Sequence, residues 1–178
     1  MADGIIYHAA TKDELAKVVH DFGVAARKCK LAGCDGVQIH AAHGFLLTTF
    51  LSPHFNKRAD EYGGPIENRS RLLFEIYDSV RNAVGVDYPI ALKLSFSDLV
   101  SDSSTPEEML WVCKELEKKG IDFIEVSSGI SADNSGASCS PVLRNGDREG
   151  KFLESALLVS DTLEIPVSSV GCYRSPDF

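Results

Sequence analysis

The feature that most constrains the fold of this chain is a regular alternation of amphipathic helices with short apolar strands. Four segments carry apolar residues at the i, i+3, i+4 and i+7 spacing of a helix. The predicted helices run from Thr11 to Gly33, Ile66 to Val84, Thr105 to Gly120 and Phe152 to Leu163. Short apolar runs between and after them predict strands over 37–39, 89–94, 123–126 and 166–170.

This alternation is typical of a parallel sheet with right-handed crossovers. Two arrangements fit it, an open doubly wound sheet and a (β/α)8 barrel. No G-x-G-x-x-G motif follows a predicted strand, which weakens the dinucleotide-binding form of the open sheet. The long connections 44–65 and 129–149 both follow strands, where a barrel places its functional loops.

Four strands cannot close a barrel that needs eight. We therefore predict an α/β fold that is a partial (β/α)8 TIM barrel, a single incomplete barrel domain over residues 1–178. Such a chain is a fragment of a longer protein, assembles with another chain, or folds in an adapted way. Its outer strands would be open edges, which predicts a homo-oligomer or pairing through those edges.

Composition narrows the class of partner. The 178 residues carry a net charge of −8, which argues against a nucleic-acid backbone or an anionic membrane surface as a partner. No apolar run approaches the roughly 20 residues that span a bilayer, and the first residues lack the pattern of a signal peptide. The five cysteines include no C-x-x-C pair, so we expect free thiols in a cytoplasmic protein.

Two histidines stand where an α/β enzyme places its chemistry. The strand over 37–39 ends on His40, and His43 follows three residues later. Alone, such a pair could simply bond backbone groups. A zinc site needs further ligands, and the sequence nominates none, so we predict no metal.

The residues around this pair resemble the Old Yellow Enzyme family of FMN-dependent NADH:flavin oxidoreductases. The resemblance runs from about Thr11 to Pro176 and includes a His-x-x-His pair and a signature loop ending in Asp60-Glu-Tyr-Gly-Gly64. The similar stretches are 32–44, 51–64, 67–69, 91–95, 125–129 and 166–176. The resemblance implies a (β/α)8 barrel with FMN at its carboxyl face, of which this chain holds strands four to seven.

The resemblance also implies a small-molecule substrate and a reaction, the reduction of electron-poor alkenes, or of flavin or quinone acceptors. NAD(P)H is the reductant, and hydride passes from reduced FMN to the β-carbon. His40 and His43 match the pair that binds the activating oxygen of the substrate and stabilises its developing charge. We therefore predict both as catalytic and substrate-binding residues of an FMN-dependent oxidoreductase.

Three further positions follow from the same resemblance. Phe45 is a predicted substrate-binding residue that stands where the family usually has a proton-donating tyrosine. Its phenyl ring cannot donate a proton, so water supplies it, the reaction differs, or activity is lost; Phe45 could also be a plain core residue. Lys93 and Gly171 are predicted to bind FMN, at the pyrimidine edge and the phosphate respectively.

A second interpretation remains open. The strands implied to be missing supply much of the flavin site in the family, so the chain could be a non-catalytic half-barrel that binds no flavin and self-associates. Four residues of the signature loop and the helix after it are predicted to order the loop rather than to take part in chemistry: Asp60, Tyr62, Asn68 and Arg69.

Overall fold

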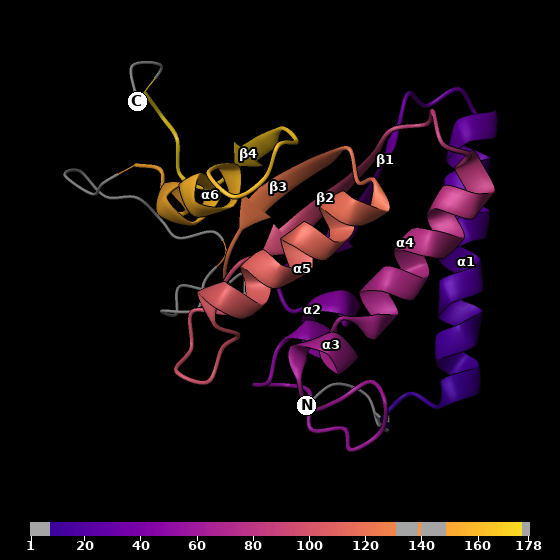
Figure 1. Cartoon of the computed structure of the whole chain (residues 1–178), viewed down its shortest axis with the longest axis horizontal. Helices are drawn as coiled ribbons and strands as arrows, with labels where there is room; N and C mark the ends of the chain where they lie inside the picture. Colours follow the sequence, from indigo (N-terminus) through magenta and orange to yellow (C-terminus); the bar gives the residue numbers. More distant parts are fainter. Residues whose placement is uncertain (1–7, 131–138, 140–148, 176–178) are drawn as a thin grey trace, which may run out of the picture.

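The computed structural model of this chain describes residues 8–130, 139 and 149–175 (Figure 1). The helices are α1 Lys12–Leu31, α2 Leu46–Leu51, α3 Ile66–Arg69, α4 Arg71–Val84, α5 Pro106–Lys119 and α6 Leu153–Ser160. The strands are β1 Val37–Ala41, β2 Ile90–Ser95, β3 Phe123–Ser127 and β4 Val167–Ser169. None of the helices in these described residues is long and apolar enough to cross a membrane.

Both helix starts predicted from capping residues are confirmed. At the start of α1, the Thr11 side chain accepts from the Glu14 N–H while the Glu14 carboxylate accepts from the Thr11 N–H, and Thr105 and Glu108 repeat the arrangement at α5. These reciprocal bonds satisfy donors that a helix start leaves unpaired. They therefore fix where α1 and α5 begin relative to the strands that follow them.

The sheet is parallel, and its strand order decides between the two predicted arrangements. The order is β1-β2-β3-β4, so each strand lies beside the next one along the chain. A doubly wound sheet reverses its order at a switch point, whereas a barrel adds strands in sequence. The described strands form an arc of the barrel kind.

The two faces of the sheet differ. Ile39, Leu92 and Ile124 point to the face that packs under the helices, and all three are buried. The alternate residues, among them Gln38 and Lys93, point to the opposite face, which carries more exposed and half-buried side chains. Figure 1 shows α4 and α5 along the sheet with α1 beside α4. The open face is the one that lines the interior of a closed barrel.

Local structure departs from the prediction in three places. β1 continues to Ala41 because His40 and Ala41 pair with β2, although His40 interrupts the apolar pattern. Helix α2 lies in a stretch predicted as loop; six residues are too few to show a helical period. The helix predicted from Ile66 is divided at Ser70 into α3 and α4. The Ile66 carbonyl accepts from both the Ser70 hydroxyl (2.7 Å) and the Ser70 N–H (2.9 Å).

Candidate active site

Two rows of polar side chains cross the open face near the carboxyl ends of the strands. Strand register places His40 beside Lys93, Lys93 beside Glu125, and Glu125 beside Ser168. Further toward the carboxyl end, His43 bonds to Ser95 through its backbone and to Ser127 through its ring. The structure thus brings His40, His43 and Lys93 together, as the sequence predicts.

His40 has a defined neutral form. Its Nδ1 accepts from the Ala42 N–H (3.1 Å), so the proton of the neutral ring lies on Nε2. Burial holds the pKa of His40 below its ordinary value, and the Lys93 ammonium acts in the same direction. At neutral pH His40 is therefore an uncharged donor through Nε2–H.

His43 is held by its backbone as well as by its ring. Its φ is 63°, a left-handed value that is uncommon outside glycine, and its N–H donates to Ser95 Oγ (3.0 Å). The next residue, Gly44, also has positive φ, and a Cβ there would lie 2.5 Å from the Ile130 carbonyl oxygen. The His-Gly pair thus forms a turn that only glycine can complete.

The ring of His43 lies in a similar electrostatic setting to that of His40. Its Nε2 bonds to Ser127 Oγ at 2.8 Å, and the two imidazole centroids are 5.4 Å apart, edge to face. Burial lowers the pKa of His43, with Lys93 and His40 adding to the effect. Two neutral imidazoles therefore face the same end of the sheet, which suits them to donate to a substrate oxygen.

Lys93 forms an ion pair with Glu125, a residue that was not predicted from the sequence. Its Nζ lies 2.6 Å from Oε1 of Glu125, and both side chains are about four-fifths buried or more, with 21% and 16% exposed. Burial would raise the pKa of Glu125, but hydrogen bonds from Lys93 and Gln38 and the Lys93 charge hold it below its ordinary value. The signal that could have revealed Glu125 is an acidic residue in register with Lys93 within an apolar strand.

Gly171 lies in a recess of about 330 Å³ at the same end of the sheet. Its φ is +113°, and a Cβ there would meet the Phe152 ring at 2.6 Å, so a side chain has neither the conformation nor the space. The recess is lined by His43, Lys93, Ser127, Cys139, Val170, Gly171 and Cys172. The Lys93 side chain and Gly171 line the same recess. A cation at this place suits an anionic ligand such as a flavin nucleotide.

Phe45 lies next to the histidine pair. Its ring meets the His40 ring edge to face with centroids 5.2 Å apart, and its side chain is exposed, so it is not a core residue within the described structure. Phe45 is also the N-cap residue of α2 and makes no side-chain capping bond. The structure therefore places an apolar, non-donating ring beside His40.

The loop-ordering prediction is confirmed. Asp60 pairs with Arg58 (2.6 Å), the Tyr62 hydroxyl donates to Glu75, and Asn68 donates to the Gly63 carbonyl. Arg69 is 5% exposed and donates to the carbonyls of Leu51 and Gly64. These bonds tie the connection after β1 to the helices below it, away from the histidine pair.

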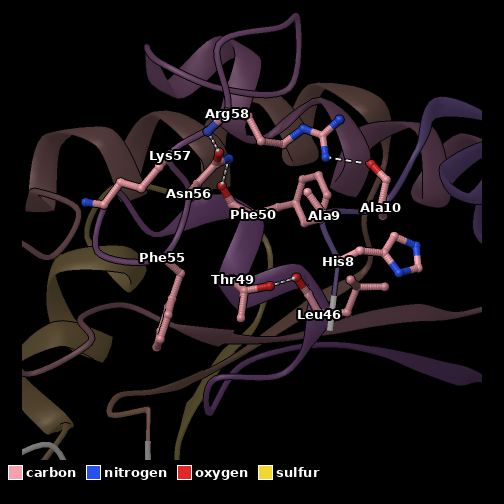
Figure 2. A pocket seen from close by; sticks show the side chains of 10 residues that line it. All are labelled: His8, Ala9, Ala10, Leu46, Thr49, Phe50, Phe55, Asn56, Lys57 and Arg58. Atoms are coloured by element: carbon pink, nitrogen blue, oxygen red, sulfur yellow. Dashed lines mark hydrogen bonds between the residues drawn. The ribbon is translucent and has the colours of Figure 1, made fainter. Parts of the chain in front are cut away.

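A larger recess of about 450 Å³ lies beside α2 (Figure 2) and shares no lining residue with the first. Arg58 donates to the Ala10 carbonyl (2.7 Å) and Asn56 to the Phe50 carbonyl (2.7 Å). Its lining residues are His8, Ala9, Ala10, Leu46, Thr49, Phe50, Phe55, Asn56, Lys57 and Arg58. None of the predicted site residues is among them, and several of its polar atoms bond to one another.

The lowered histidine pKa values predict a pH effect on stability. In the unfolded chain both rings titrate near their ordinary pKa of about 6.5, whereas the fold favours the neutral form. Their contribution is therefore intact above about pH 6.5 and is lost as pH falls toward the lower folded pKa values. Urea unfolding at pH 7.5 and pH 5.5 should show a smaller difference for His43→Gln than for the wild type. The exposed His20→Gln is the control; an unchanged difference in His43→Gln would contradict the prediction.

The sequence matches a known protein family over nearly its whole length. The profile of the NADH:flavin oxidoreductase / NADH oxidase family matches residues 2–177. The chain is 36% identical over 170 residues to the NADH oxidase of Thermoanaerobacter brockii, covering 94% of this chain and 25% of that protein. It is 43% identical over 119 residues to the NADPH dehydrogenase of Geobacillus thermodenitrificans, covering 67% of this chain and 34% of the relative.

A solved structure has a similar fold. The Old Yellow Enzyme homologue from Zymomonas mobilis superposes with a TM-score of 0.73 at 29% identity, over 94% of this chain and 44% of that structure. The fold is accordingly a partial TIM barrel, as predicted, and the chain spans about a quarter to a third of the length of these two curated relatives. Family membership supports FMN as the cofactor and NAD(P)H as the reductant. The chain belongs to the NADH:flavin oxidoreductase / NADH oxidase family.

Proposed function

We propose that this chain carries the substrate-binding half of an FMN-dependent NAD(P)H oxidoreductase site that reduces electron-poor alkenes or quinone-like acceptors. The observation that carries the proposal is the grouping of His40, His43 and Lys93 at the carboxyl end of one parallel sheet. In parallel α/β folds this edge is where ligands bind.

FMN would be held by Lys93 and by the backbone at Gly171, which line one recess. When bound, FMN supplies the hydride that the alkene receives, and NAD(P)H restores it. Lys93 contributes a positive charge, of the kind that stabilises a reduced, anionic flavin. Gly171 contributes backbone to the wall of this recess, and its lack of a Cβ leaves room for the Phe152 ring.

The two imidazoles would bind the activating oxygen of the substrate. His40 presents Nε2–H, because its Nδ1 is already an acceptor. A hydroxyl can donate or accept, so Ser127 can donate to His43 Nε2 and leave Nδ1–H as the second donor. Because both rings are neutral, they stabilise charge that builds on this oxygen without protonating it beforehand.

Phe45 gives this proposal a specific prediction. The ring beside His40 has no acidic hydrogen, so protonation of the product carbon falls to solvent. Phe45→Tyr should raise the rate of alkene reduction by an FMN-loaded chain about tenfold, toward the gain typical of a positioned acid. Phe55→Tyr, an exposed aromatic residue outside the rows, is the control. Equal rates for wild type and Phe45→Tyr would show that proton delivery is not the limiting defect.

The outer edges of the sheet favour a second candidate, the self-association of a half-barrel. β1 and β4 are the outer strands of the sheet within the described residues, and their outer edges have no strand partner there. Such edges pair readily with another chain. We expect the purified chain to have at least the mass of a dimer in light scattering at micromolar concentration. A monomer mass over the whole concentration range would rule this candidate out.

The spectrum of the purified chain separates the two functions. We expect yellow protein with stoichiometric FMN, bleached by NADPH or NADH and restored by an α,β-unsaturated ketone. A colourless protein that does not take up added FMN would leave only the self-associating half-barrel. A yellow protein that NAD(P)H does not bleach would retain the flavin site and remove the proposed reaction.

A further inference from the structure

Glu125 connects three strands on the open face. Its Oε1 lies 2.6 Å from Lys93 Nζ on β2, and its Oε2 accepts from Gln38 Nε2 on β1 at 2.8 Å. Gln38 is in register with Ala91 of β2, and its amide reaches β3 across that small side chain. Both carboxylate oxygens are thus committed to partners in this row.

The energetic need for such a partner follows from burial. The Lys93 side chain is four-fifths buried. A charged group that loses hydration on burial requires a compensating charge or hydrogen bonds. Lysine also has a long, flexible stem, so its charge has no fixed place unless a neighbour holds it. Among the described residues, Glu125 is the one whose carboxylate lies within hydrogen-bond distance of Lys93 Nζ, at 2.6 Å.

We propose that Glu125 is a positioning residue that holds the Lys93 ammonium in the row beside His40. The functional meaning of this role rests on the proposed function, in which Lys93 faces the flavin. Without the carboxylate, the Lys93 side chain would extend toward solvent to recover its hydration. The charge beside the imidazoles would then move away, although Lys93 itself is unchanged.

The histidines report where this charge stands. The charged groups acting on them are Lys93, which lowers the pKa of both rings, and Glu125, which raises both; His40 also lowers the pKa of His43. If Glu125 positions Lys93, removing the lysine should change the pKa of His40 only while the Glu125 carboxylate is present. If Glu125 is only a neighbouring charge, removing the lysine should have the same effect in either background.

The experiment is a double-mutant cycle read by proton NMR titration of the cofactor-free chain. We expect Lys93→Gln to raise the pKa of His40 by about 0.5 unit in the wild-type background. This size is typical of one charge on a neighbouring strand that is partly screened by solvent. In the Glu125→Gln background we expect Lys93→Gln to shift that pKa by less than about 0.1 unit. The five histidines are assigned with His40→Leu and His43→Leu variants.

Equal shifts in the two backgrounds, or no shift in the wild type, would overturn the proposal. Glu115→Gln is the matched control, because Glu115 pairs with Lys118 on α5 and should leave both histidine pKa values unchanged. If Glu125→Gln does not fold by circular dichroism, Glu125→Asp keeps the charge and withdraws it by one methylene. We expect at least a halved effect of Lys93→Gln in that background, and an undiminished effect would again contradict the proposal.

This cycle needs no flavin, so its outcome is separate from that of the proposed function. If the effect of Lys93→Gln depends on Glu125 but the chain binds no FMN, the positioning role of Glu125 stands and the proposed flavin site does not. If the chain binds FMN but the effect of Lys93→Gln does not depend on Glu125, the flavin site stands and the positioning role does not.

Discussion

His40→Leu is expected to slow alkene reduction by the FMN-loaded chain by about 10²- to 10³-fold, the usual cost of removing one donor from a developing oxyanion. Leucine fills a similar volume but has no Nε2–H. That group is the free donor of the neutral His40 ring, because Nδ1 accepts from the Ala42 N–H. The rate of NADPH oxidation that depends on an α,β-unsaturated ketone measures the effect.

His54→Leu is the matched control for this prediction. His54 lies on the connection after α2, where its Nδ1 bonds to Asp102 (2.8 Å). We expect the rate of this variant to stay within about threefold of the wild type. A His40→Leu chain that retains the wild-type rate would remove the imidazole from the reaction.

Arg69→Met is expected to lower the free energy of unfolding by about 3 kcal/mol, because it removes a buried charged donor that serves two backbone carbonyls and one carboxylate. The guanidinium is almost wholly buried and lies 2.7 Å from Glu108, the residue that caps α5. It also donates to the Leu51 carbonyl at the end of α2 and to the Gly64 carbonyl before α3. The change removes the Arg69 partner of Glu108, which keeps its bond from the Thr105 N–H, and it takes this donor from two carbonyls at one junction of three helices.

Urea unfolding followed by circular dichroism measures this loss. Arg27→Met on α1 is the control, because Arg27 is exposed and the same change there should stay within about 0.5 kcal/mol. Arg69→Lys should fall between the two, since it keeps the charge and loses the planar fork that serves several acceptors. A loss below about 1 kcal/mol in Arg69→Met would show that the junction does not depend on this side chain.

The sequence predicted the fold because long periodic elements dominate it. The capping residues of α1 and α5 and the apolar stripes of α1, α4 and α5 are strong local signals, and helices between the strands indicate a parallel sheet. Short elements were weaker: α2 has six residues, and β1 continues past a polar residue because pairing with β2 outweighs local preference. The order of strands, which selects the barrel arc, depends on long-range pairing that no single segment encodes.

For the site, the sequence predicted which residues gather but not how they are held. His40, His43, Lys93 and Gly171 all lie at the carboxyl end of the sheet, and three of them line one recess. The partner of Lys93 was missed, because register between β2 and β3 decides that Glu125 lies beside it. The tautomer of His40 was missed as well, since it depends on one backbone N–H two residues away.

The most direct test of the flavin site is a fluorescence titration of FMN with the wild-type chain and with Gly171→Val. We expect the wild type to bind FMN one to one, and Gly171→Val to bind at least tenfold more weakly, because Gly171 has a φ of +113° and a Cβ would meet Phe152. Gly33→Val is the control, since Gly33 also has positive φ but a Cβ there meets nothing within 4 Å. Equal affinities in all three chains, or no binding by the wild type, would contradict a flavin site in this recess.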